Sequence, residues 1–138
     1  MPLSAVELTL DGNIEELERL AQEVTRFCRD NDLDEDIEFD LNLAFDELFV
    51  NAVKHGGCKG MKEAARVRIE LQEEGVRAEF ADRGSEFDPT MVTPPDLSAP
   101  LAARPPGGLG LHLVRNTMQD VQYRRDGGWN HVSMWRPV

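Results

Sequence analysis

The sequence indicates an α+β domain in which helices cover one face of a mainly antiparallel sheet, forming a two-layer sandwich. Three features support this prediction: short runs of alternating apolar residues, two long segments with helical spacing, and glycine-bearing turns between them. The runs at 67–71 and 76–80 are separated by only a few residues, which favours a hairpin. Residues 1–138 are expected to form one domain, because this length suits a single core.

The N-terminal segment is expected to form a strand followed by a helix. Residues 6–10 alternate between apolar and polar side chains, which predicts the strand. Asp11-Gly12-Asn13 then predicts a turn, and Asn13 is the expected N-cap of the helix. Apolar side chains recur at helical spacing from about residue 14 to 28, so the helix is expected there.

A second helix is expected from about residue 36 to 55, where the glycine pair 56–57 ends it. Glu47 and Asn51 lie four residues apart, so both side chains project from the same side of this helix. On a helical wheel they fall along one edge of the apolar stripe. An acid and an amide are therefore expected between core and solvent, where a pocket wall would be.

The C-terminal part is expected to contain two hairpins, with an irregular segment and a third helix between them. The hairpins turn near 73–75 and 126–128. Six of the eight prolines fall between 88 and 107, with little periodicity, which is typical of a lid or mobile loop. The third helix, with glycines at its start, is expected from about 109 to 118.

The composition restricts the partners and the location that we expect. A net charge of −11 argues against direct nucleic-acid binding, and no apolar run is long enough to span a bilayer. The first residues lack the features of a signal peptide, so a cytoplasmic location is expected. Cys28 and Cys58 are predicted to be ordinary thiols, because no further ligand pair accompanies them. A phosphate-bearing ligand would need a divalent cation and backbone N–H donors to offset the negative field.

Two glycine-bearing segments follow the acid–amide pair in the sequence. They are Asp82-Arg83-Gly84 and Gly107-Gly108-Leu109-Gly110. Glycine allows a ligand to approach the backbone closely, and a helix start presents free N–H groups to an anion. Each segment alone has a plainer interpretation, as the end of a strand or the start of a helix. The ordered set indicates a pocket for a metal-bound nucleotide.

These motifs resemble those of an ATPase superfamily shared by type II topoisomerases, sensor histidine kinases and bacterial anti-sigma-factor kinases. Glu47-x-x-x-Asn51, followed by Lys54-His55-Gly56, resembles its N box. Asp82-x-Gly84 is similar to its first glycine box, and Gly108-x-Gly110-Leu111 is similar to its second. The short chain is most similar to the anti-sigma-factor serine/threonine kinases. The resemblance implies a Bergerat-type ATP-binding fold, with an ATP lid at about 88–107.

The resemblance implies ATP and Mg²⁺ as ligands and gives the N-box residues their roles. Asn51 would bind Mg²⁺, which favours hard oxygen ligands. Glu47 would act as the general base or orient the attacking hydroxyl. Asp82 would accept the adenine amino proton, which distinguishes adenine from guanine, and Gly84 would let the backbone approach the base.

The remaining roles implied by the resemblance concern the phosphates and one edge of the base. Gly108 and Gly110, with Leu111 completing the box, would give close approach to the phosphates. Arg104 lies where the family often carries a basic lid residue that contacts phosphate. Ser133 stands where a hydroxyl residue helps to hold the adenine.

The implied function is that of an ATP-dependent protein serine/threonine kinase that regulates transcription. It would phosphorylate an antagonist protein of STAS type and sequester a sigma factor or a similar regulator, and homodimers are common in the family. One alternative is a switch module with a vestigial nucleotide pocket, favoured by the proline-rich lid and by Glu86 where the family often has a second glycine. Another is the catalytic fragment of a histidine kinase, whose phosphoacceptor region the sequence lacks.

Overall fold

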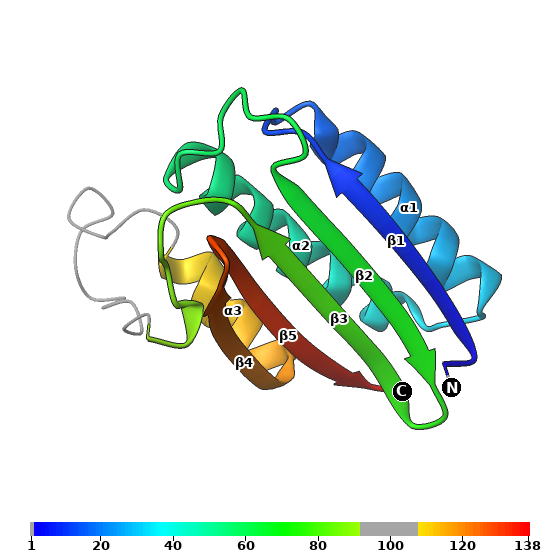
Figure 1. The fold of residues 1–138 in the computed structure, drawn as a ribbon. Coiled ribbons are helices and arrows are strands. Elements are labelled where there is room, and N and C mark those ends of the chain that lie inside the picture. Colours follow the sequence, from blue (N-terminus) through cyan, green and yellow to red (C-terminus); the bar gives the residue numbers. More distant parts are fainter. Residues whose placement is uncertain (1, 92–107) are drawn as a thin grey trace.

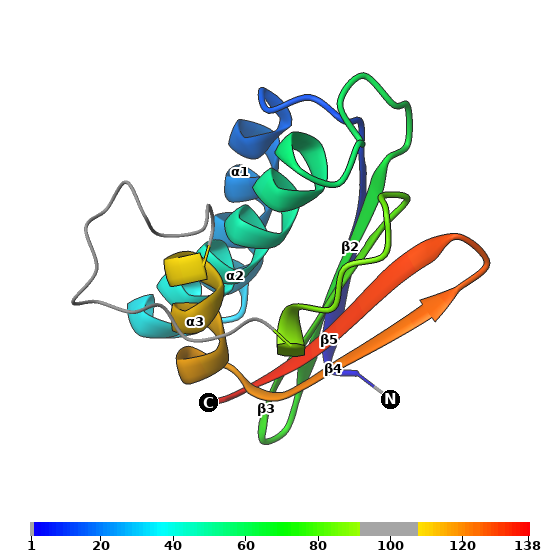
Figure 2. The ribbon, with the colours of Figure 1, turned by 90° about the vertical axis from the view of Figure 1, so that its left-hand side faces the viewer.

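The computed structural model describes residues 2–91 and 108–138, and these form two layers (Figure 1). One layer is a five-stranded sheet of order β1-β2-β3-β5-β4, in which the neighbouring strands of the described chain pair antiparallel. The other layer consists of the described α-helices, which cover one face of the sheet and leave the other open (Figure 2). The predicted α+β sandwich with helices on one face is confirmed. None of the described helices is long and apolar enough to cross a membrane.

The elements follow the order that the sequence predicts, with a short 3₁₀ turn added before the third helix. They are β1 (Ser4–Leu10), α1 (Glu16–Asp30), α2 (Glu35–Lys54), β2 (Ala65–Gln72), β3 (Gly75–Asp82), η1 (Pro89–Met91), α3 (Gly108–Thr117), β4 (Gln119–Asp126) and β5 (Trp129–Pro137).

The strand register separates a buried face of the sheet from an open one. Phe80 on β3 pairs with Val67 on β2 and with Val132 on β5, and all three side chains are buried. Successive side chains of a strand point to opposite faces, so this register places every second residue under the helices. The intervening residues are presented on the open face.

The central helix of the helical layer is α2, whose apolar stripe faces the sheet. Its buried residues recur at helical spacing, as an amphipathic helix requires. Phe45 is fully buried, whereas Phe39 on the same helix is 66% exposed. Full burial of one phenylalanine contributes about 1.5–3 kcal/mol. The buried stripe comprises Ile37, Leu41, Ala44, Phe45, Leu48, Phe49, Ala52 and Val53.

The start of α1 differs from the prediction, because Asn13 is not its N-cap. Hydrogen bonds from the N–H of Glu16 to the carbonyl of Asn13 (2.9 Å) and from Leu17 to Ile14 (3.0 Å) form a tighter turn first. The Asn13 side chain accepts the N–H of Glu15 at 3.0 Å within that turn. The helix therefore begins at Glu16, after the turn has closed.

Both cysteines lie in the interior as free thiols. Burial raises the pKa of Cys28 to about 11 and also raises the pKa of Cys58. Gly12 packs against the carbonyl group of Cys58 so closely that a Cβ atom there would overlap it. Gly12 also donates to the Met61 carbonyl (2.7 Å) and accepts from the N–H of Gly60 (2.8 Å). These contacts join the β1–α1 turn to the loop after α2.

Phe45→Ala is expected to lower the free energy of unfolding by about 3–5 kcal/mol, because it leaves a cavity among fully buried side chains. Phe39→Ala on the exposed side of α2 is the matched control, with an expected change of about 0.5 kcal/mol or less. Urea denaturation followed by circular dichroism measures both values. Similar losses for the two variants would contradict the described packing of α2.

Candidate functional site

A cavity of about 100 Å³ opens between the last turns of α2, the end of β3 and the start of β5. Asn51 from the N box and Asp82 from the first glycine box both line it, although they come from separate motifs. A larger hollow of about 650 Å³ lies on the open face of the sheet and contains Ser133 among the predicted site residues. The smaller cavity is therefore the candidate nucleotide site. Its lining is completed by Leu48, Ala52, His55, Gly56, Ser85, Glu86, Phe87, Pro89, Asn130 and Val132.

The side chain of Asn51 has an unsatisfied polar atom at this cavity. Its Nδ2 atom is buried, and no group in the described chain accepts a hydrogen bond from it. Rotation of the amide by half a turn would place Oδ1 there instead, since the two orientations have nearly the same shape. An amide oxygen suits Mg²⁺. Within residues 2–91 and 108–138 no three acidic, His or Cys side chains group as metal ligands, so other ligands would come from phosphates and water.

The carboxylate of Glu47 lies one helical turn before Asn51 and packs against α3. A Cβ atom at Gly110 would overlap this carboxylate, so the glycine permits the close approach. Burial raises the pKa of Glu47. Burial, with the charge of Glu47 as a second cause, also raises the pKa of the adjacent Asp46. Because burial disfavours the charged form, this half-buried carboxylate accepts a proton more readily than an exposed glutamate does.

The second glycine box forms the start of α3, which begins at Gly108. Gly110 meets Glu47, as described, whereas the Leu111 side chain is 3% exposed and belongs to the hydrophobic core. The structure thus places Leu111 in the packing beneath the helix and not in the cavity lining. Arg104 and most of the predicted lid lie outside the described residues.

Asp82 ends β3 as a nearly buried acid, with 9% of its surface exposed. Asn130, its register partner on β5, donates to Asp82 Oδ1 through Nδ2 at 3.0 Å. The backbone N–H of Gly84 donates to the same oxygen at 2.8 Å. Burial raises the pKa of Asp82, and these two hydrogen bonds oppose the rise. Because both donors use Oδ1, Oδ2 remains available to a ligand.

Asn130 also anchors the glycine turn to the last two strands. Its Nδ2 donates to the carbonyl of Ser85 at 2.8 Å, and its Oδ1 accepts from the Tyr123 hydroxyl (2.7 Å) and Arg125 Nη1 (3.0 Å). Arg125 Nη1 also donates to the carbonyl of Gly84 at 2.7 Å. The donors and acceptors around the amide agree on one orientation. The network therefore holds the turn that follows Asp82.

Asn130, and not Ser133, is the polar β5 side chain at the cavity. Residues 130 and 133 differ by an odd number of positions along the strand, so they point to opposite faces. Ser133 Oγ accepts a hydrogen bond from Arg77 Nη1 at 3.1 Å on the open face. The structure therefore does not bring Ser133 to Asp82.

Sequence analysis missed Asn130, because a lone asparagine after a glycine pair belongs to no recognisable motif. His55 lies in the N-box motif, but the motif predicts no role for it at the site. The structure places His55 in the cavity lining. Glu86 lines the cavity too, at the position where the family often carries glycine.

The two-layer fold, with Asn51 and Asp82 on one cavity, defines the class of ATPase domains that the sequence motifs resemble. The profile of the histidine kinase-like ATPase domain family matches residues 10–136. The chain belongs to this family.

Curated relatives of the chain include two named protein kinases. The serine/threonine-protein kinase BtrW of Bordetella bronchiseptica is 35% identical over 98 residues, which covers 71% of this chain and 69% of BtrW. The serine-protein kinase RsbW of Bacillus cereus is 36% identical over 98 residues, which covers 68% of this chain and 60% of RsbW. The chain thus matches less than two thirds of the length of RsbW.

A solved structure of the RsbU and RsbW domains of a Mycobacterium tuberculosis protein is also similar. Its TM-score is 0.72, and the match covers 99% of this chain and 33% of that chain at 19% identity. At this identity the likeness supports the fold alone.

Asn130→Ala is expected to raise the pKa of Asp82 further, because it removes the amide donor that opposes the effect of burial. The free energy of unfolding should fall by about 1–3 kcal/mol, since the Tyr123 hydroxyl loses its acceptor and Arg125 loses one of its two. Carbon-13 NMR of the Asp82 carboxyl group across pH measures the first effect. Ser133→Ala on the other face is the control. An unaltered titration of Asp82 in Asn130→Ala would disprove the coupling.

Proposed function

We propose that this chain is an ATP-dependent protein serine/threonine kinase of the anti-sigma-factor type. The observation that carries the proposal is that Asn51 and Asp82, from separate motifs, line one cavity, with Glu47 one helical turn away. Membership of the histidine kinase-like ATPase domain family supports ATP as the nucleotide. The kinases BtrW and RsbW among its relatives support a protein as the phosphate acceptor.

At the base end of the proposed site, Asp82 selects adenine. Its Oδ2 would accept the adenine amino group, while Asn130 and Gly84 hold Oδ1 and so set the direction of the carboxylate. Guanine presents a carbonyl oxygen at the corresponding edge, which would repel the carboxylate. The nearly buried setting of Asp82 strengthens this discrimination, because the effective dielectric there is low.

At the phosphate end, Asn51 would hold Mg²⁺ through its amide oxygen, and the cation would neutralise phosphate charge when bound. The start of α3 would present backbone N–H groups and a positive helix end to the phosphates. Glu47 would take the proton from the hydroxyl of the protein substrate while the hydroxyl oxygen bonds to the γ-phosphorus. The bond from that phosphorus to the bridging oxygen breaks, and ADP leaves.

The proposed substrate is an antagonist protein of STAS type, phosphorylated on serine or threonine. Phosphorylation would release the antagonist and free the kinase to hold a sigma factor or a similar regulator. The likeness to RsbW supports this class of partner. We place the protein in the cytoplasm as a regulator of transcription, acting as a homodimer as is common in the family it resembles.

A second candidate function is a regulatory switch that binds partners without phosphate transfer. Glu86 favours it, because a second carboxylate in the lining opposes an anionic ligand. The cavity of about 100 Å³ is also smaller than most small-molecule sites, which span roughly 300–1,000 Å³. Calorimetry that detects no binding of Mg²⁺-ATP to the wild-type protein would favour this function over the kinase.

The kinase proposal is tested with purified protein, radiolabelled ATP, Mg²⁺ and a candidate STAS-type antagonist. Label is expected on the antagonist, and an antagonist whose acceptor hydroxyl is replaced by alanine should remain unlabelled. Bound ATP without any transfer to such substrates would refute the kinase half of the proposal.

Glu47→Gln is expected to reduce phosphate transfer by roughly 100-fold or more, because the amide cannot accept the hydroxyl proton. ATP affinity should change by about three-fold or less, since Glu47 is absent from the cavity lining. Single-turnover transfer and calorimetry measure the two quantities. Glu35→Gln, on the first turn of α2, is the matched control. Wild-type transfer by Glu47→Gln would remove the assigned role.

Asn51→Ala is expected to weaken ATP binding in Mg²⁺ by roughly ten-fold or more, through loss of an oxygen ligand to a charged group. Binding in EDTA should change much less, because the amide would then have no cation to hold. Titration calorimetry with and without Mg²⁺ measures the difference. Asn42→Ala is the control, since Asn42 lies on α2 outside the cavity lining. Equal losses with and without Mg²⁺ would exclude the metal role.

A further inference from the structure

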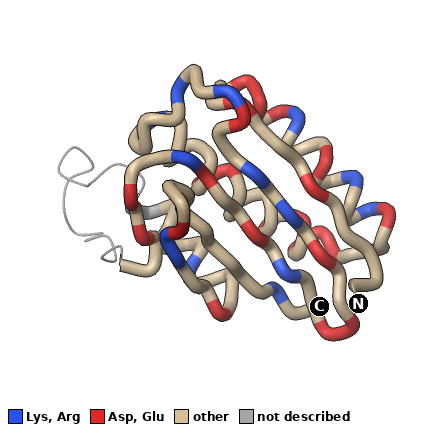
Figure 3. The backbone as a smooth tube through the Cα atoms, viewed as in Figure 1, with Lys and Arg blue, Asp and Glu red and all other residues tan. Residues whose placement is uncertain are grey.

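The open face of the sheet carries a concentration of arginines that the proposed kinase site does not use. In contrast, α2 in the helical layer carries six acidic residues and one lysine. Figure 3 shows the basic positions on the strands, mixed with a few acidic ones. A chain with a net charge of −11 thus presents an arginine-rich surface on one side. The arginines of this face are Arg66, Arg68, Arg77, Arg83 and Arg124.

Two of these arginines meet at Trp129. The guanidinium carbons of Arg66 and Arg83 lie 4.4 and 4.9 Å from the centre of its ring. Among the described residues neither arginine belongs to an ion pair, whereas the other three on this face each pair with a carboxylate. Two cations held at one ring repel each other, and a carboxylate bound beside them would offset that repulsion.

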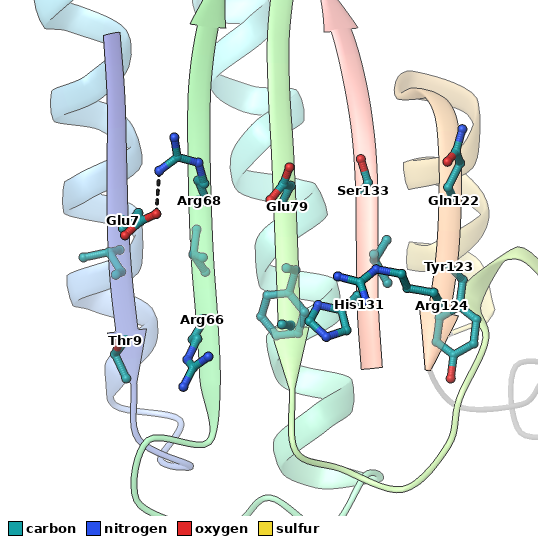
Figure 4. Close-up of a pocket in the computed structure, with 15 residues that line it drawn as sticks. Glu7, Thr9, Arg66, Arg68, Glu79, Gln122, Tyr123, Arg124, His131 and Ser133 are labelled. Carbon is teal, nitrogen blue, oxygen red and sulfur yellow. Dashed lines mark hydrogen bonds and ion pairs between the residues drawn. The ribbon is translucent and has the colours of Figure 1, made fainter. Parts of the chain in front are cut away.

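Of these two arginines, Arg66 also lines the large hollow of the open face, together with Arg68 and Arg124. Arg66, Ala81, His131 and Arg124 are register neighbours on four strands, so they form a row across the sheet. The small side chain of Ala81 leaves room in the middle of this row. Figure 4 shows Arg124 extending across β5 towards His131. Burial, followed by the charge of Arg124, lowers the pKa of His131, which agrees with a positive local field.

The chemistry of the hollow fits carboxylates borne by a protein. Guanidinium groups bind carboxylates in a bidentate fashion, and stacking on Trp129 holds them in place for this. Glu7 and Glu79 also line the hollow, and they would repel the continuous row of phosphates that a nucleic acid presents. A protein segment can place its carboxylates individually between these acids.

We propose that the open face of the sheet, centred on Arg66, Arg83 and Trp129, is a docking surface for an acidic segment of a partner protein. This surface faces away from the candidate nucleotide site, because Arg83 and the cavity-lining Asp82 are adjacent in the chain and point to opposite faces. The proposal therefore does not depend on ATP binding or on phosphate transfer.

Fluorescence anisotropy with a labelled ten-residue peptide of alternating Glu and Gly tests the surface. The wild-type protein is expected to bind this peptide with an affinity that falls as the NaCl concentration rises. It should show no binding to a Gln–Gly peptide of equal length. The double variant Arg66→Gln/Arg83→Gln should bind roughly five-fold more weakly or worse. Arg26→Gln/Arg29→Gln on α1 changes the charge equally and should keep its affinity within about two-fold. Circular dichroism checks that both variants fold.

A tryptophan signal locates the bound peptide. The chain has two tryptophans, so Trp135→Phe leaves Trp129 as the reporter, and its emission is expected to change when the Glu–Gly peptide binds. Absence of binding, or equal weakening in the two double variants, would overturn the proposal. Tighter binding of a ten-nucleotide single strand would assign the surface to nucleic acid instead. A sedimenting dimer lost in Arg66→Gln/Arg83→Gln would assign it to a second copy of the chain.

Discussion

Burial of the apolar stripe of α2 is the constraint on which the candidate site depends. Eight buried side chains fix the rotation of this helix over the sheet. A shift of one residue would turn every side chain by about 100° about the helix axis. With the rotation fixed, Glu47 meets α3 at Gly110 and Asn51 faces the cavity. The polar edge of the helix is therefore positioned by the burial of its apolar face.

Most of the fold could be predicted because buried apolar residues recur at regular intervals along each helix and strand. The stripe of α2 and the alternation of β2 and β3 are local patterns, and each predicted element lies within a few residues of its observed bounds. The predicted N-cap of α1 was wrong because a 3₁₀-type turn precedes the helix. Whether a 3₁₀ turn or an α-helical turn forms first depends on contacts that composition does not reveal.

The candidate site was only partly predictable, because its polar network joins distant parts of the chain. Asp82 and Gly84 belong to a short motif and could be found by spacing. Asn130 could not, since it reaches Asp82 only through the β3–β5 register, across 48 positions of sequence. The same register explains why Ser133, three residues further along the strand, faces the open side of the sheet. A hydroxyl on the last strand is informative only when the direction of its side chain is known.

The two interior thiols can report on local opening and on global unfolding of this chain. Cys58 lies under the first glycine turn, where a Cβ atom at Gly84 would be 3.4 Å from its sulfur, whereas Cys28 lies in the last turn of α1. Both side chains are fully buried and have raised pKa values, so an alkylating reagent reaches either one only after the surrounding chain has opened. Comparison of the two labelling rates would therefore separate a local fluctuation beneath the turn from global unfolding, without any introduced probe.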